Sequence, residues 1–147
     1  MTTRTGWALA AAAVVALAGC SGMKDKMPDW MPGSGAMKVS LSGAEEVPPV
    51  KSGAKGSGSF RVMEDGTLSG SVTTEGVQGT MAHIHRGAKG QNGPVIIPLV
   101  KKGDTYSVPE GKKLTDAQIN DLKAGHLYVN VHSNTHKGGE IRAQLQP

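Results

Sequence analysis

The sequence predicts an all-β domain, an antiparallel β-sandwich or barrel-like fold with one short helix. Six or seven short segments alternate apolar and polar residues, as half-buried strands do. Turn residues, including many of the 21 glycines, separate these segments. A single segment, near residues 116–124, carries helix signals instead. Short strands with frequent turns are typical of antiparallel sandwiches and barrels, so this class follows.

The sequence from 38 to 73 predicts a strand followed by a β-hairpin. The strands are predicted at 38–42, 58–63 and 68–73. Residues 64–67 read Glu-Asp-Gly-Thr, and an Asp-Gly pair tolerates the positive φ angles of a tight turn. Phe60 and Val62 share one face before this turn, and Leu68 and Val72 share one face after it. These four side chains are therefore expected in the core.

Further strands are predicted on either side of a helix. They lie at 79–85, 95–99, 127–132 and 140–145. The helix is predicted over 116–124 because Thr115 and Gln118 form a capping box and Gly125 is a suitable C-terminal stop. In 127–132 the apolar residues face the core, which places Tyr128 and His132 on the opposite face.

The N-terminal residues predict export and lipid anchoring. Arg4 precedes an apolar run at 8–17, which is too short to span a bilayer and is typical of a signal peptide. Leu-Ala-Gly-Cys at 17–20 resembles the bacterial lipobox, so we expect cleavage before Cys20 and acylation of its thiol. An ordinary signal peptide is the alternative. The chain then divides into a signal peptide (1–19), a flexible tether (20–36) and a domain (37–147).

The predicted location is the bacterial cell envelope. Ser21, and not Asp, follows Cys20, which in a Gram-negative host implies sorting to the outer membrane, facing the periplasm. Cys20 is the only cysteine, so an internal disulfide is excluded. The formal charge is +4, but the lysines are scattered, and one Phe and two Tyr offer no platform for bases. The membrane is therefore an expected partner and nucleic acid is not.

Two histidines on one strand are the leading candidates for a functional site. His83 and His85 are two residues apart, so both project from the face opposite the core. His132 projects from the corresponding face of its own strand. If the two strands are close together, three imidazoles meet on a solvated surface. Three neutral imidazoles suit copper or zinc, and copper heads the affinity order.

Other residues are less certain members of this site. His126 has the same parity and is a less certain fourth ligand; it lies six residues from His132, about 20 Å along an extended strand, so the two cannot share an ion if that strand is unbroken. His136, in a predicted loop, is an alternative fourth ligand. Glu140 is a candidate acceptor for a ring N–H, which would set the tautomer of a ligand. A site without metal, made only of exposed strand histidines, is the competing interpretation.

Four separated motifs resemble a known family, the CHRD domain. They are AHIHRG at 82–87, GPV at 93–95, GHLYVNVH at 125–132 and GEIRAQL at 139–145. The resemblance spans about 37–147 and implies an all-β, immunoglobulin-like or dismutase-like sandwich. The His-x-His strand is also similar to the copper strand of copper–zinc superoxide dismutases. No clear Asp for a zinc site is present, so dismutation would use copper alone.

These resemblances leave the function open between two classes. In the first, the protein buffers copper or dismutates superoxide, with Arg86 or Arg142 attracting the anion. In the second, it is a metal-free envelope module that binds a protein or a glycan through an exposed apolar patch. Whether the protein is an enzyme stays open. The metal hypothesis requires that the ring nitrogens of His83, His85 and His132 can approach within about 4 Å of one another once rotamer changes are allowed.

Overall fold

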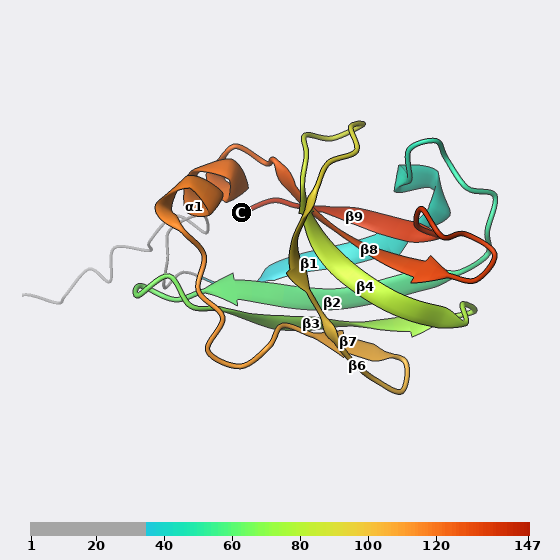
Figure 1. Cartoon of the computed structure of the whole chain (residues 1–147), viewed down its shortest axis with the longest axis horizontal. Helices are drawn as coiled ribbons and strands as arrows, with labels where there is room; N and C mark the ends of the chain where they lie inside the picture. Colours follow the sequence, from blue (N-terminus) through green and yellow to red (C-terminus); the bar gives the residue numbers. More distant parts are fainter. Residues whose placement is uncertain (1–34) are drawn as a thin grey trace, which may run out of the picture.

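The computed structural model describes residues 35–147, and Figure 1 shows its arrangement. The predicted signal peptide, the lipidation residue Cys20 and nearly all of the predicted tether at 20–36 lie outside these residues. Within the described residues, no helix combines the length and the apolar character that crossing a bilayer requires.

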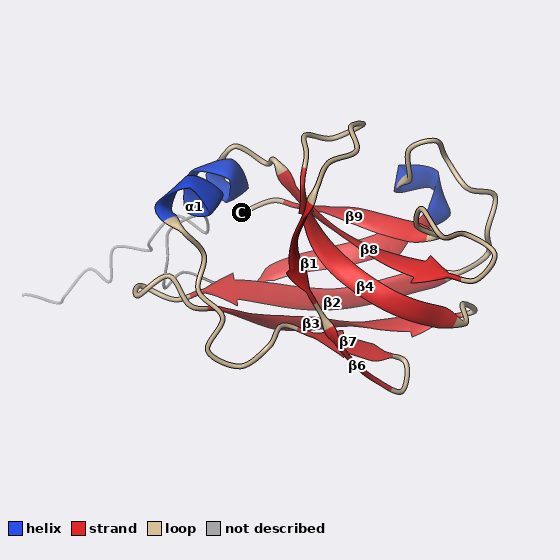
Figure 2. Ribbon diagram, in the orientation of Figure 1, coloured by secondary structure: helices blue, strands red, loops and turns tan. Residues whose placement is uncertain are grey.

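Nine antiparallel strands, one α-helix and a short 3-10 turn (η1, Gly43–Glu45) make up the domain, which confirms the predicted all-β class. The strands are β1 (Met37–Ser42), β2 (Lys55–Val62), β3 (Leu68–Glu75), β4 (Gly79–Arg86), β5 (Val95–Pro98), β6 (Val100–Lys102), β7 (Thr105–Ser107), β8 (Leu127–Ser133) and β9 (Ile141–Leu145). The helix α1 spans Asp116–Lys123 and lies at one end of the sheet (Figure 2).

All nine strands belong to one sheet, in the order β5-β4-β8-β9-β1-β2-β3-β7-β6. Its two ends, β5 and β6, come from one run of chain and are separated only by Leu99. The Leu99 N–H donates to the Ala82 carbonyl of β4, while β6 pairs with β7. The sheet is therefore nearly closed around the core, with β8 and β9 on one side and β2 and β3 on the other (Figure 1).

The core consists of the apolar faces that alternation predicts. Phe60, Val72, Ile84, Val129 and Ile141 are each fully buried, and they come from five different strands. The faces expected for β2, β3, β8 and β9 are confirmed, because the apolar residues of each strand point into one shared interior.

Local signals located the hairpin and the helix correctly. Gly66 adopts a φ of 82°, as the predicted turn at 64–67 requires. Thr115 and Gln118 form the complete capping box at the start of α1. Gly125, with a φ of 72°, follows the end of the helix.

The sequence did not reveal β6, β7 or the first three residues of β2. Residues 100–102 are all exposed and have no buried face to produce alternation. The beginning of β2 reads Lys-Gly-Ser, yet it pairs with both β1 and β3. These segments are strands because of their neighbours, since backbone pairing there needs no apolar pattern.

Candidate metal centre

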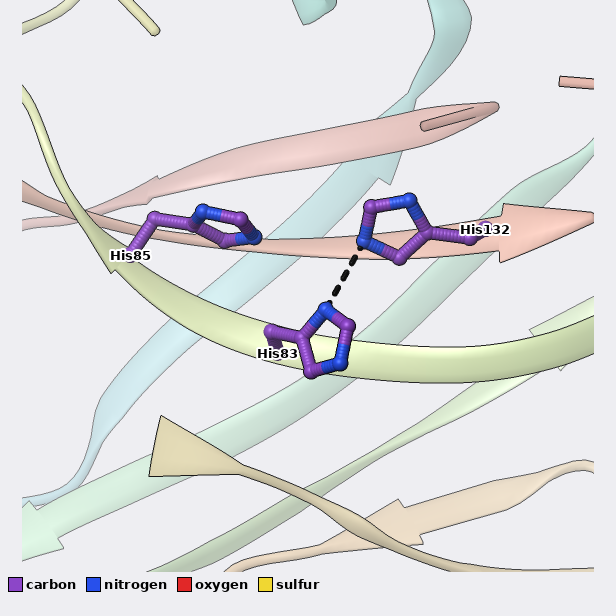
Figure 3. A group of neighbouring side chains, drawn as sticks. All are labelled: His83, His85 and His132. Carbon is purple, nitrogen blue, oxygen red and sulfur yellow. Dashed lines mark hydrogen bonds between the residues drawn. The ribbon is translucent and has the colours of Figure 1, made fainter. Parts of the chain in front are cut away.

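Neighbouring strands bring His83, His85 and His132 together. β4 pairs directly with β8, with Met81 opposite His132 and His83 opposite Asn130. Because directly opposite residues point to the same face, the histidines of both strands share a face. Figure 3 shows His85 and His132 approaching from opposite sides, with His83 completing a triangle. The pairing of β4 with β8 therefore places these three histidines close together on one face, as the matching parity predicted.

The ring nitrogens converge. One nitrogen from each of His83, His85 and His132 lies within 4.8 Å of the other two, and His83 Nδ1 is 3.0 Å from His132 Nε2. A metal ion about 2.0–2.1 Å from each ligand nitrogen places tetrahedral ligands roughly 3.3 Å apart. One pair already has this spacing, and small side-chain rotations would bring the third nitrogen to it.

Backbone carbonyls determine which nitrogen of each ring carries the proton. His85 Nδ1 lies 2.9 Å from the Gly93 carbonyl, and His132 Nδ1 lies 2.9 Å from the Lys137 carbonyl. A carbonyl only accepts, so each Nδ1 is the donor and each neutral ring keeps its lone pair on Nε2. His83 Nδ1 in turn donates to His132 Nε2. The Nε2 of His85 is buried and has no hydrogen-bond partner among the described residues.

The unpartnered Nε2 of His85 indicates that these three residues are suited to bind a metal ion. A buried acceptor without a partner costs free energy, and a metal ion would use its lone pair. Oriented histidines whose second nitrogen donates to a carbonyl are the usual arrangement of metal ligands. The three residues would supply a neutral, all-imidazole set.

The cluster is buried, and the expectation of a solvated surface was wrong. His85 and His132 are each only 8% exposed, while His83 is half-buried. The loop before β5 contributes the Gly93 carbonyl and the loop before β9 contributes the Lys137 carbonyl. Both loops therefore cover this face, and every residue of β8 is buried.

Burial keeps the three rings neutral. It lowers the pKa of His83, and the neighbouring His132 and His85 lower it further. It also lowers the pKa of His85, where the Gly93 carbonyl partly opposes the shift. The pKa of His132 is lowered by burial against the opposing effect of the Lys137 carbonyl. Rings that resist protonation are ready to bind a cation at neutral pH.

Arg142 lies in the interior and does not face solvent, contrary to the expectation for an anion-attracting residue. It is 1% exposed, and its guanidinium lies 3.3 Å from the centroid of the Tyr128 ring. It donates to Asn92 Oδ1 and to the Gln91 carbonyl. The Tyr128 ring also stacks on His85, with an interplanar angle of 4°. Arg142 thus supports the loop and the aromatic ring beside the cluster.

The remaining candidate residues lie apart from the cluster. Arg86 pairs with Asp121 at 2.8 Å. His126 lines a shallow surface pocket with these two side chains. Through its backbone, His136 forms the turn after β8. Within the described residues, neither His126 nor His136 belongs to the converging group.

Glu140 makes hydrogen bonds other than those expected for it. Its carboxylate accepts from the hydroxyls of Ser52 and Ser133. The acceptors for the ring N–H groups are the two backbone carbonyls instead. No sequence pattern marks a carbonyl, so these acceptors could not have been identified before the structure.

Sequence reasoning also missed a buried polar group behind the cluster. Glu46 is 4% exposed and Asn130 is 2% exposed. Burial raises the pKa of Glu46 to about 7, against the lowering effects of Arg142, the Asn130 side chain and the backbone of Val47. The only available signal was the position of Asn130 two residues before His132, on the same face of the predicted strand. Glu46 itself precedes a Val-Pro-Pro segment and carried no signal.

Comparison with known families identifies a matching family model. Residues 37–145 match the family model of the CHRD domain, which covers all of the described strands and the helix. No curated protein and no solved structure matches the chain.

Proposed function

The chain belongs to the CHRD domain family. From the geometry of the three imidazoles we propose that the cluster of His83, His85 and His132 binds a copper ion. The observation that carries this proposal is the convergence of three ring nitrogens, with two Nδ1 atoms held by carbonyls. Zinc is the second candidate metal. Within the described residues, the converging group includes no carboxylate and no thiolate.

Copper is favoured over zinc by the ligand type and the affinity order. Imidazole suits both metals, but Cu(II) lies above zinc among divalent ions bound to the same ligands. The proposed role is buffering or sequestration of copper in the cell envelope. Acylation of Cys20 would hold the domain at the membrane surface, as the lipobox-like sequence suggests.

A catalytic role is a narrower version of this proposal. Copper would supply one-electron chemistry, including superoxide dismutation if a coordination position stays open to the substrate. Arg86 is the exposed cation on β4 nearest in sequence to His85, although Asp121 pairs with it. A superoxide assay on the copper-loaded chain distinguishes buffering alone from turnover.

The alternative, a metal-free module for a protein or glycan partner, has less support. It calls for an exposed apolar patch away from the histidines. The large exposed apolar side chains among residues 35–147 are Met63, Met81, Val95 and Val100. They come from four separate segments, and Met81 itself lies on the histidine face.

Calorimetric titration of the metal-free chain tests the proposal. The chain carries Cys20→Ser, so that its thiol cannot bind metal, and it has no histidine tag. We expect one copper ion per chain to bind at pH 7 with a dissociation constant below micromolar, and zinc to bind more weakly. Binding no tighter than micromolar for zinc and for copper in either oxidation state would overturn the proposal.

Gly93→Ala is expected to weaken copper binding about 10- to 100-fold, as loss of an outer hydrogen bond to a ligand usually does. An alanine Cβ at this position would overlap the carbonyl oxygen of Arg86, so the loop must move. Its carbonyl would then leave His85 Nδ1. The measurement is the copper affinity by calorimetry.

Gly138→Ala is the matched control for this variant. Gly138 lies in the loop before β9, and a Cβ there meets no atom within 4 Å. Its copper affinity should equal that of the unmodified chain. Equal affinity of Gly93→Ala and Gly138→Ala would show that the Gly93 carbonyl does not orient His85.

A further inference from the structure

Met81 borders the histidine cluster on β4 and is a large apolar side chain that remains exposed. It lies directly opposite His132 in the β4–β8 ladder and two residues before His83. All three side chains therefore share one face. Its side chain is 51% exposed, although most of its neighbours on this face are buried. A flexible thioether thus lies at the open edge of three imidazoles.

We propose that the thioether of Met81 is a fourth ligand and that the cluster is a site for Cu(I). The inference rests on the proposed function, because it assumes that the three histidines bind copper. It goes further by naming the oxidation state and an additional ligand.

The spacing along and across the strands puts the Met81 thioether within reach of the three imidazoles. Directly opposite residues have Cβ atoms about 4.5–5.5 Å apart, and residues two apart on one strand are about 6–7 Å apart. Methionine is unbranched and has three side-chain rotations, so it adapts to irregular geometry. Because half of the side chain is exposed, its movement toward the rings breaks little packing.

The chemistry of the four groups selects for a soft, singly charged ion. Thioether sulfur is a soft ligand that favours Cu(I), whereas zinc and Cu(II) gain less from it. Three imidazoles and a thioether are all neutral, so the bound ion keeps its full charge. A buried ion of charge +1 costs less to desolvate than one of charge +2.

The surrounding charges also favour a singly charged ion. The buried guanidinium of Arg142 lies 3.3 Å from the centroid of the Tyr128 ring, and this ring stacks on His85. The guanidinium therefore opposes any cation at the cluster, and a divalent one more strongly. Glu46 is the buried carboxyl that interacts with Arg142, but its raised pKa of about 7 leaves it only partly ionised at neutral pH. Its negative charge thus offsets the guanidinium incompletely.

A fourth protein ligand has a consequence for the two roles proposed above. Four protein ligands complete a tetrahedral coordination and leave no open position for a substrate. The Met81 site therefore favours storage or delivery of Cu(I) over superoxide dismutation.

The test compares Met81→Leu with Met63→Leu, both in the Cys20→Ser chain. Met63 is 45% exposed and follows β2, so it is a matched control for loss of an exposed thioether. Cu(I) affinity is measured without oxygen by competition with a chromophoric Cu(I) chelator. Cu(II) affinity is measured in parallel by calorimetry. Methionines of the predicted tether contribute equally to every variant.

We expect Met81→Leu to weaken Cu(I) binding about tenfold or more and to change Cu(II) binding by less than about threefold. Met63→Leu should change neither. X-ray absorption of the Cu(I) form should show a copper–sulfur contribution that diminishes in Met81→Leu alone.

The outcomes separate this inference from the proposed function. If the unmodified chain binds copper and Met81→Leu binds Cu(I) equally well, Met81 is not a ligand, and the histidine site stands. If the unmodified chain binds neither Cu(I) nor Cu(II), both the histidine site and the role of Met81 are overturned.

Discussion

Replacing both His83 and His85 with alanine is expected to weaken copper binding by at least about 100-fold, more than the loss of an outer hydrogen bond would cause. The two residues supply two of the three converging nitrogens, so His132 would be left as a single imidazole. A single imidazole does not hold a metal ion tightly at neutral pH. The measurement is calorimetric titration of copper at pH 7.

The control for this variant is His126→Ala with His136→Ala. It removes the same number of imidazoles, but from residues outside the converging group. Its copper affinity should match that of the unmodified chain. Circular dichroism of each metal-free protein shows whether the fold survives, since His85 stacks on Tyr128 and its removal leaves a gap. Loss of affinity in the control alone would place the metal at the loop histidines.

Glu46→Gln is expected to stabilise the fold relative to the unmodified protein, and more so at high pH. The gain in the free energy of unfolding should be about 2 to 3 kcal/mol larger at pH 8 than at pH 5. Burial raises the pKa of Glu46 from 4.5 to about 7 in the folded protein. Between these values the folded state holds a proton that the unfolded chain has released. Glu46 therefore stabilises the fold fully below pH 4.5, and this contribution is lost as the pH rises through 7.

The histidines have the opposite pH dependence, which cancels in this comparison. Burial lowers the pKa of His83, His85 and His132, so their contribution is present above the unfolded value of 6.5 and is lost as the pH falls through their folded values. Both proteins carry the same histidines. The difference between Glu46→Gln and the unmodified protein therefore reports on Glu46.

Urea unfolding of the metal-free proteins at pH 5 and pH 8 measures this effect. Glu45→Gln is the control, because Glu45 is the adjacent residue but is exposed. Its effect should be within about 0.5 kcal/mol at either pH. If Glu46→Gln changes stability equally at both pH values, the Glu46 carboxyl is ionised in the fold and its proposed titration near neutrality is wrong.

Local patterns were sufficient for much of the fold. The Asp-Gly turn at 64–67 and the capping box of Thr115 and Gln118 depend on residues a few positions apart, so the sequence displays them completely. The apolar faces of β8 and β9 were also predictable, because alternation is a property of a single strand. β6 and β7 were not predictable, since three residues are too few to show alternation: β6 is exposed throughout, and β7 buries Tyr106 alone.

The burial of the second face of β8 and β9 is the clearest difference between expectation and structure. Tyr128, Asn130 and Arg142 are polar residues that alternation places outside the core, yet each is 2% exposed or less. Two loops cover them, one before β5 and one before β9. The position of a covering loop depends on contacts between distant segments, such as Arg142 with Asn92, which no local pattern encodes.

The sequence by itself determined that His83 and His85 share a face and that His132 has the matching parity, because the two-residue period of a strand is a local geometric property. Only the tertiary structure decided the rest. The pairing of β4 with β8 brought the three rings together, and the Gly93 and Lys137 carbonyls selected the nitrogens that face one another. Strand pairing, register and loop position depend on packing between segments that are distant in the sequence. Local patterns therefore could not show that three histidines of matching parity form a buried cluster.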